Sequence, residues 1–182
     1  MINKRKARKR GETMVYIKEI SMDDCSQLLE FELANKGFFE NYIPARDSSY
    51  YSVEGIARSI ELMYSLRNQD EYYLYLVRNE SDDLVGRINI FNINRDHLSA
   101  EIGYRIGESH TGKGYAERSV ELIEHHAATQ LGIKILTAQT IASNMASARV
   151  LVKRHFTLTE TVKNLLPFNG QLHDAHIFQK EI

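Results

Sequence analysis

Apolar and polar side chains alternate along some short segments of the chain and recur at helical spacing along others. Successive side chains of a strand point to opposite faces, so the alternation predicts strands at residues 15–20, 72–77, 84–93, 100–106, 134–140, 157–165 and 172–179. Apolar spacings of three and four predict helices at residues 22–36, 52–68, 116–131 and 144–155. The order βααβββαβαββ predicts an α+β fold, with a mixed, largely antiparallel sheet of about seven strands and helices on both faces.

The first predicted helix shows both its ends and its buried side in the sequence. Ser21 is a good N-cap, and Gly37 is expected to end the helix. Five side chains form the expected buried stripe: Leu28, Leu29, Phe31, Leu33 and Asn35. A loop rich in aromatic side chains follows at residues 38–51. Much later, the letters P-F-N-G at residues 167–170 predict a hairpin turn.

A loop with several glycines stands between the fourth predicted strand and the third predicted helix. Gly107, Gly112 and Gly114 interrupt the regular pattern there. The first N–H groups of a helix have no internal partner and attract anions, and glycine lets the backbone approach a phosphate closely. The sequence therefore predicts a ligand that carries phosphate. The dinucleotide pattern G-x-G-x-x-G fails for lack of a third glycine, and a nucleotide P-loop lacks the hydroxyl residue that should follow Lys113.

The same loop resembles the pyrophosphate loop of a large enzyme family. Its letters T-G-K-G-Y-A are similar to the Q/R-x-x-G-x-G/A loop of the GNAT superfamily of acetyl-CoA-dependent N-acetyltransferases. Gly114 and Ala116 occupy the two small positions, whereas Thr111 stands where the family usually has Gln or Arg. The resemblance implies that six residues of the loop contact the cofactor: Thr111, Gly112, Lys113, Gly114, Tyr115 and Ala116.

A second motif lies one helix and one strand further along. Residues 144–156 read N-M-A-S-A-R-V-L-V-K-R-H-F and resemble the N-x-x-S-x-R-V-L-x-K-x-G-F segment of the RimJ/RimL-like, ribosomal-protein N-acetyltransferase branch. His155 replaces the usual glycine, so the turn after this helix is expected to differ. With two motifs in the right order and separation, the chain resembles this branch from about Met14 to its C-terminus.

The resemblance implies a GNAT-like fold and acetyl-CoA as the co-substrate. In that family the fourth and fifth strands splay apart beside the loop, and the strand backbone freed in this way binds the pantetheine arm. Here that backbone would belong to Tyr104, Arg105 and Ile106. Asn144 and Ser147, which share one face of the following helix, would reach the cofactor from there.

The implied transfer needs a base for the amine proton and an acid for the departing thiolate. Glu101 resembles the Glu of the family's E-I-G-Y segment and is the candidate base, acting through water; a structural pair with a neighbouring basic side chain is the alternative. Many relatives use a tyrosine as the acid at the position of Leu151, so either another hydroxyl serves, with Ser147 as the candidate, or the thiolate leaves without an acid. The aromatic loop supplies candidate acceptor contacts, with ordinary core packing as the alternative: Phe38, Phe39 and Tyr42.

Length and composition limit the classes of protein to which this chain can belong. The 182 residues suffice for one domain with a substantial core, and no apolar run approaches the roughly 18 residues of a membrane span. The single cysteine, Cys25, cannot form an internal disulfide, which fits a cytoplasmic protein. The histidines lack the spacing of metal ligands, so no metal site is predicted.

The N-terminal end differs in charge from the rest. Residues 1–10 carry six basic and no acidic side chains, which leaves 17 basic against 24 acidic side chains, or −7, for residues 11–182. We predict residues 1–13 as a basic, flexible arm and residues 14–182 as a single N-acetyltransferase domain. Such an arm could contact RNA phosphates, but it could equally be a disordered leader or an extension before a start at Met14.

Three functions remain open on the sequence alone. The first is acetylation of a protein N-terminus, such as that of a ribosomal protein, because an α-amine (pKa about 7.7–8.0) loses its proton far more easily than lysine (about 10.4). The second is acetylation of a small amine such as a polyamine, which the acidic body would attract. The third is a non-catalytic acyl-CoA-binding domain, which the missing tyrosine supports. Ribosome association and a homodimer are also left undecided.

Overall fold

The computed structural model describes residues 14–182, so the arm predicted at residues 1–13 lies outside the described residues. Its strands and α-helices are β1 (Val15–Glu19), α1 (Cys25–Phe39), α2 (Val53–Asn68), β2 (Tyr72–Asn79), β3 (Leu84–Asn94), β4 (Ser99–Ile106), α3 (Tyr115–Leu131), β5 (Ile135–Ile141), α4 (Met145–Lys153), β6 (Thr157–Phe168) and β7 (Gln171–Glu181). Short 3-10 turns are η1 (Met22–Asp24), η2 (Ser48–Tyr50) and η3 (Glu108–His110). The predicted element order and the α+β class are confirmed. Within this part of the chain, no helix is long and apolar enough to cross a membrane.

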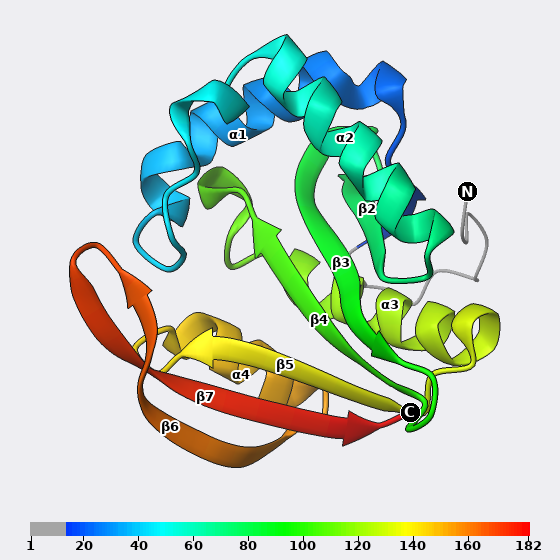
Figure 1. The fold of residues 1–182 in the computed structure, drawn as a ribbon, viewed down its shortest axis with the longest axis vertical. Helices are drawn as coiled ribbons and strands as arrows, with labels where there is room; N and C mark the ends of the chain where they lie inside the picture. Colours follow the sequence, from blue (N-terminus) through cyan, green and yellow to red (C-terminus); the bar gives the residue numbers. More distant parts are fainter. Residues whose placement is uncertain (1–13) are drawn as a thin grey trace.

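The strands form one seven-stranded sheet in the order β1-β2-β3-β4-β5-β7-β6 (Figure 1). All neighbours run antiparallel except β4 and β5, which are parallel. In Figure 1, α1 and α2 lie together on one side of the sheet, and α3 and α4 lie behind it. Both faces of the sheet are therefore covered, as the mixed pattern of strands and helices predicts.

Each face of the sheet has its own apolar core. Neighbouring residues of β2 show the division, because Leu74 and Leu76 pack under α1 and α2, whereas Tyr75 and Val77 pack on the side of α3. Side chains alternate across a strand, so a strand buried on both faces feeds two cores in turn. The core on the α3 side also takes in residues of α4, β5 and β7.

Strands β4 and β5 share only a short parallel contact. Their register runs from Ser99 opposite Ile135 to Ile102 opposite Ala138, and it stops there. Beyond this point β4 stays paired with β3, and β5 stays paired with β7, so the two strands diverge. Figure 1 shows the resulting opening between them.

Helix α1 differs from its prediction at its end and along its buried side. It runs through Gly37 to Phe39, so the prediction that Gly37 ends it is wrong. The glycine keeps a helical backbone because the helix gains the packing of Phe39, which is 6% exposed. The buried side of α1 is also rotated relative to the predicted stripe, because Glu32 is 1% exposed whereas Leu33 is 50% exposed. Ion pairs of Glu32 with the sheet, described below, explain the rotation.

Helix α4 ends in a Schellman motif. The N–H of Phe156 donates to the carbonyl of Leu151 at 3.0 Å, and the N–H of His155 donates to the carbonyl of Val152 at 2.9 Å. His155 has a φ of +64°, the left-handed conformation that glycine adopts most easily. The prediction that this turn would differ is therefore wrong, because histidine holds the conformation typical of glycine.

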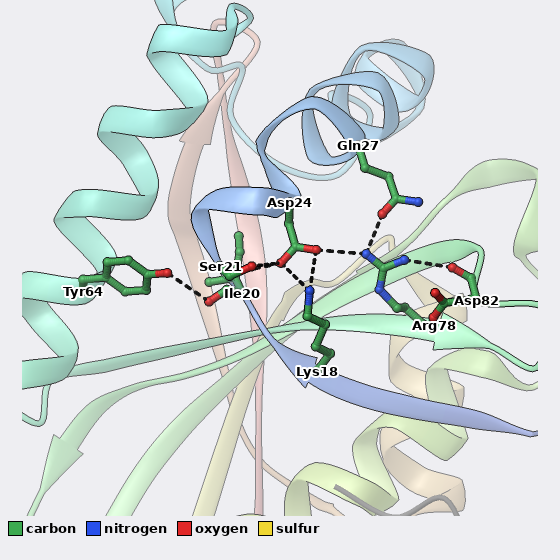
Figure 2. Close-up of polar contacts among 8 residues, drawn as sticks. All are labelled: Lys18, Ile20, Ser21, Asp24, Gln27, Tyr64, Arg78 and Asp82. Carbon is green, nitrogen blue, oxygen red and sulfur yellow. Dashed lines mark hydrogen bonds and ion pairs between the residues drawn. The ribbon is translucent and has the colours of Figure 1, made fainter. Parts of the chain in front are cut away.

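A buried carboxylate fixes the start of α1 to the edge of the sheet (Figure 2). Asp24 accepts hydrogen bonds from Lys18 Nζ at 2.7 Å, from the backbone N–H and hydroxyl of Ser21 at 2.8 Å each, and from Arg78 Nη2 at 3.1 Å. Ser21 thus caps the turn η1 that leads into α1. Burial acts to raise the pKa of Asp24, but the hydrogen bonds from Lys18 and Ser21 outweigh it and hold the pKa below its ordinary value.

Removing the charge of Asp24 should cost stability in a way that depends on pH. Asp24→Asn is expected to lower the free energy of unfolding by about 3 kcal/mol at neutral pH, because Arg78 and Lys18 lose a carboxylate in a buried setting. A lowered pKa stabilises the fold above the pKa of the unfolded chain, and this gain is lost as the pH falls through the folded pKa. The wild type and the variant should therefore begin to converge only as the pH falls below about 4, and they should meet below the folded pKa of Asp24. Urea unfolding across this range measures both effects.

Asp23→Asn is the matched control, because Asp23 is the neighbouring acid and is exposed. It should leave the free energy of unfolding within about 0.5 kcal/mol of the wild type. Equal losses in the two variants would contradict the role given to Asp24.

Candidate functional site

A cavity of about 460 Å³ lies where β4 and β5 part. Its walls come from the end of α1, the end of β4, the loop before α3, the first turn of α3, and one face of α4 with its N-cap. Most of the residues predicted from the sequence line it: Phe38, Phe39, Tyr42, Tyr104, Arg105, Ile106, Thr111, Gly112, Gly114, Tyr115, Ala116, Asn144 and Ser147. The structure thus brings four separate segments to one place. Glu101 and Lys113 are not among the lining residues.

The edge of β4 presents free backbone to this cavity. The N–H of Gly107 donates to the carbonyl of Val85 at 2.9 Å, which sets the alternation of the antiparallel ladder with β3. Odd-numbered residues at the end of β4 therefore bond to β3, which takes the backbone of Arg105 out of the predicted pantetheine contacts. The backbone of Tyr104 and Ile106 turns the other way. That side has no strand partner beyond Ile102. The two peptide groups can exchange hydrogen bonds with an extended, amide-bearing ligand.

Helix α3 begins at the cavity with donors that have no partner in the helix. Gly114 is its N-cap, with a φ of +79°, and no side chain of the described residues caps it. Arg118 is the first residue to donate within the helix, to the carbonyl of Gly114 at 3.1 Å. The N–H groups of Tyr115, Ala116 and Glu117 therefore precede the helical ladder. Together with the helix dipole they favour an anion at this end.

The loop before α3 is held by its own hydrogen bonds. In η3, His110 donates its N–H to the carbonyl of Gly107 at 2.8 Å, and the hydroxyl of Thr111 donates to the carbonyl of Glu108, also at 2.8 Å. Gly112 follows with a φ of +71°. The Thr111 hydroxyl is thus engaged within the loop, and the backbone rather than this side chain is presented to a ligand.

Two hydroxyl groups meet on the α4 side of the cavity. Tyr104 Oη lies 2.9 Å from Ser147 Oγ, and Tyr104 also donates to the Ser147 carbonyl at 3.2 Å. Asn144 holds the turn by accepting the N–H of Ser147 at 3.0 Å. Burial raises the pKa of Tyr104 to about 12, only partly offset by the bond to Ser147, so the phenol keeps its proton at neutral pH. Leu151, at the family's tyrosine position, is 1% exposed and belongs to the core.

Aromatic side chains form the opposite wall. The rings of Phe38 and Tyr42 meet edge to face with centroids 5.6 Å apart, at the end of α1. The turn of the β6–β7 hairpin closes toward the same region, because Asn169 Nδ2 donates to the carbonyl of Glu40 at 3.0 Å. Asn169 and Gly170 both take positive φ, as the predicted turn at residues 167–170 requires.

A buried ion-pair cluster supports this wall. Glu32 of α1 places Oε1 3.0 Å from Arg87 Nη1 and Oε2 3.2 Å from Arg105 Nη1. Arg87 also donates to the hydroxyl of Tyr50 at 3.4 Å. The Arg105 guanidinium lies 5.1 Å from the ring centre of Phe39. Tyr104 and Arg105 thus leave opposite faces of β4 and reach the same cavity, because β5 no longer covers the strand edge between them.

Glu101 lies outside the cavity, in the last paired section of β4. It is half-buried, and its Oε2 accepts a hydrogen bond from Asn92 Nδ2 at 3.1 Å. Burial raises the pKa of Glu101, and the bond from Asn92 offsets part of this shift. The side chains of Glu101 and Arg105 lie on the same face of β4, because the two residues are four positions apart along the strand. The predicted role as a base therefore requires a bridge of water and stays a prediction.

Sequence reasoning missed several residues of the cavity wall: Ile43, His110, Glu117, Ala146, Arg149, Val150 and Lys153. Four of them, at positions 146, 149, 150 and 153, share one face of α4 at helical spacing, and that spacing could have found them. Lys153 also approaches Glu117 of α3 at 3.4 Å. His110 gives no signal in the sequence, because its place depends on the fold of the loop.

Comparison with known proteins identifies the relatives of this chain. The family model described as "Acetyltransferase (GNAT) domain" matches residues 15–157. A protein of Bacillus subtilis (strain 168) named "Probable N-acetyltransferase YjcK" is 29% identical over 170 residues, which cover 92% of this chain and 93% of that protein.

Solved structures share the fold. Ribosomal-protein-S5-alanine acetyltransferase from Vibrio fischeri superposes with a TM-score of 0.87 at 20% identity and covers 92% of both chains. Mycobacterium smegmatis RimJ, solved in complex with CoA-disulfide, superposes with a TM-score of 0.86 at 20% identity and covers 92% of this chain and 81% of its own.

Proposed function

Because the chain belongs to the acetyltransferase (GNAT) family, we propose that its cavity binds acetyl-CoA and that the acetyl group passes to the α-amine of a protein N-terminus. One observation carries the proposal. The open edge of β4 and the uncapped start of α3 line a single cavity of about 460 Å³. The backbone of the β4 edge can form hydrogen bonds with a chain of amides, and the N–H groups at the start of α3 can bind a diphosphate. Coenzyme A contains both groups.

The cavity residues fit the parts of this co-substrate. The N–H groups at the start of α3 would hold the diphosphate, and the backbone of Tyr104 and Ile106 would pair with the pantetheine amides. Bound acetyl-CoA would supply the activated acetyl thioester. A backbone N–H freed at the end of β4 would stabilise the negative charge that develops on the thioester oxygen. Mycobacterium smegmatis RimJ, which shares the fold, was solved in complex with CoA-disulfide, and this supports CoA chemistry for the proposed ligand.

The acceptor would enter from the side of the aromatic wall. An α-amine costs about 1 kcal/mol to deprotonate at neutral pH, whereas a lysine costs almost 5 kcal/mol, on the order of 1.36 kcal/mol per pKa unit. The candidate base, Glu101, lies outside the cavity and would act through water, which suits the substrate that is easier to deprotonate. The hairpin turn near Glu40 and the rings of Phe38 and Tyr42 border a space that a peptide end can enter.

Proton transfers would use groups on both faces of β4. Glu101 would accept the amine proton through water, along a face where Gly103 contributes no side chain. On the other face, the Ser147 hydroxyl, held by Tyr104, would give a proton to the thiolate. The high pKa of Tyr104 keeps this pair neutral and hydrogen-bonded at the pH where the amine reacts.

A thiol-release assay with acetyl-CoA tests the function directly. We expect release with peptides that have a free N-terminus, and at least about tenfold lower kcat/KM with the same peptides carrying only a lysine amine, because of the difference in pKa. Release with spermidine but not with peptides would instead indicate a small-amine acetyltransferase. Tight binding of acetyl-CoA without release to any amine would indicate a non-catalytic module.

The start of α3 can be tested by a matched pair of glycine variants. Gly114→Val should raise the KM for acetyl-CoA about tenfold, because a β-branched residue resists the left-handed backbone that aims these N–H groups. Gly132→Val is the control: Gly132 has a φ of +67° at the other end of α3, away from the cavity. Both variants should lose similar stability, which thermal unfolding measures. Equal KM values in the two variants would contradict a phosphate site at Gly114.

The role of Glu101 has its own test. Glu101→Gln should lower kcat severalfold or more while the KM for acetyl-CoA stays constant, because the base acts on the amine only. The exposed Glu181 on β7 provides the control variant Glu181→Gln, which should leave kcat unchanged. Protonation of the α-amine lowers kcat/KM of both enzymes as the pH drops, and the wild type should lose more than Glu101→Gln, since burial raises the pKa of Glu101 and protonation removes the base. A rate for Glu101→Gln equal to wild type across about pH 6–9 would exclude Glu101 from the mechanism.

A further inference from the structure

Two arginines stand directly opposite each other on neighbouring strands. Arg87 of β3 pairs in register with Arg105 of β4, a placement in which like charges repel. Glu32 of α1 lies between them, at 3.0 Å from Arg87 and 3.2 Å from Arg105. The side chains of Arg87 and Glu32 are 4% and 1% exposed. One buried carboxylate therefore serves two guanidinium groups, and the cluster keeps one positive charge in excess.

The charged groups nearby do not remove the excess. The guanidinium of Arg46 lies 4.2 Å from the ring centre of Tyr50, at the edge of the same cluster. Burial and the charge of Arg87 lower the pKa of Arg105 to about 9, against the smaller opposing effect of Glu32. Arg105 is still protonated at neutral pH, with a charge that its surroundings only partly balance.

Of the three clustered residues, only Arg105 lines the cavity. Its guanidinium lies against Phe39 and leaves the face of β4 opposite to Tyr104, so it is on the side of the aromatic wall and away from the start of α3. A cation placed there cannot serve the diphosphate site. A purely structural cluster would also be more stable with a neutral residue at this position, since surplus buried charge is costly.

Resting on the proposed function, we propose that Arg105 selects acceptors that carry a carboxylate beside the reacting amine, namely protein N-termini with Asp or Glu within their first three residues. Glu32 divides its single charge between Arg87 and Arg105. A carboxylate of the acceptor would give Arg105 an ion-pair partner of its own. Hydrogen bonds between ionised partners are among the strongest in proteins, and the planar guanidinium suits a carboxylate. The same charge would repel polyamines, although the protein body is acidic.

The test uses peptides that differ in one residue, with Glu, Gln or Lys at the second position after an N-terminal Ser. In the wild type, kcat/KM for the Glu peptide should exceed that for the Gln peptide at least about tenfold, and the Lys peptide should be the poorest. In Arg105→Gln, the ratio of Glu to Gln should fall to about one. The exposed Arg58 of α2 supplies the control Arg58→Gln, which should keep the wild-type ratio. If Arg105→Gln does not fold, Arg105→Met replaces it, because its apolar stem keeps the contact with Phe39.

Failure of the inference and failure of the proposed function give different results. Equal turnover of the Glu and Gln peptides by the wild type would overturn the selection by Arg105 and leave the N-acetyltransferase function intact. If no peptide is turned over, the proposed acceptor class fails, and calorimetric binding of the acetylated Glu and Gln peptides to the enzyme with CoA then decides. Tighter binding of the acetylated Glu peptide, lost in Arg105→Gln, supports the inference, and equal binding overturns it.

Discussion

The parting of β4 from β5 is the constraint on which the rest of the structure depends. A backbone N–H or carbonyl that is buried without a partner costs about 1–3 kcal/mol, so strands rarely give up a neighbour inside a protein. After Ile102, β4 does so, and its outer peptide groups at Tyr104 and Ile106 face a cavity instead of a strand. The fold keeps this edge within reach of solvent or ligand. Helices α3 and α4 start at the same opening, and their ends add further polar groups to it.

An exposed strand edge also lets both faces of one strand serve one site. Tyr104 and Arg105 are neighbours in the chain and point in opposite directions, yet both line the cavity. Tyr104 contacts the hydroxyl of Ser147 on α4, and Arg105 forms an ion pair with the carboxylate of Glu32 on α1. The cavity therefore has a hydrogen-bonding side at Tyr104 and Ser147 and an aromatic side that carries the guanidinium of Arg105. Under the proposed function, the thioester would lie on the first side and the amine would approach from the second.

Periodicity was enough to place the strands and helices of the described chain, because each depends on local alternation between core and solvent. Periodicity failed to predict the buried side and the end of α1, because these depend on contacts with residues that are distant in the sequence or lie beyond the predicted end. Glu32 is buried in place of Leu33 because Arg87 and Arg105, more than fifty positions away, hold its carboxylate. Gly37 stays within α1 because Phe39 packs beyond it. Likewise, the two motifs indicated the loop and Asn144, whereas His110 and the cluster of Glu32 required the tertiary structure.

The two apolar cores of residues 14–182 share no residue, and this separation has a consequence for how such a protein can change. Substitutions in the layer beneath α1 and α2 alter the aromatic and cationic wall, while the start of α3 and α4 rests on the other layer. Effects of changes at distant, unconnected positions are nearly additive. Descendants of one ancestor could thus diverge in the amines they accept while keeping the same binding site for acetyl-CoA.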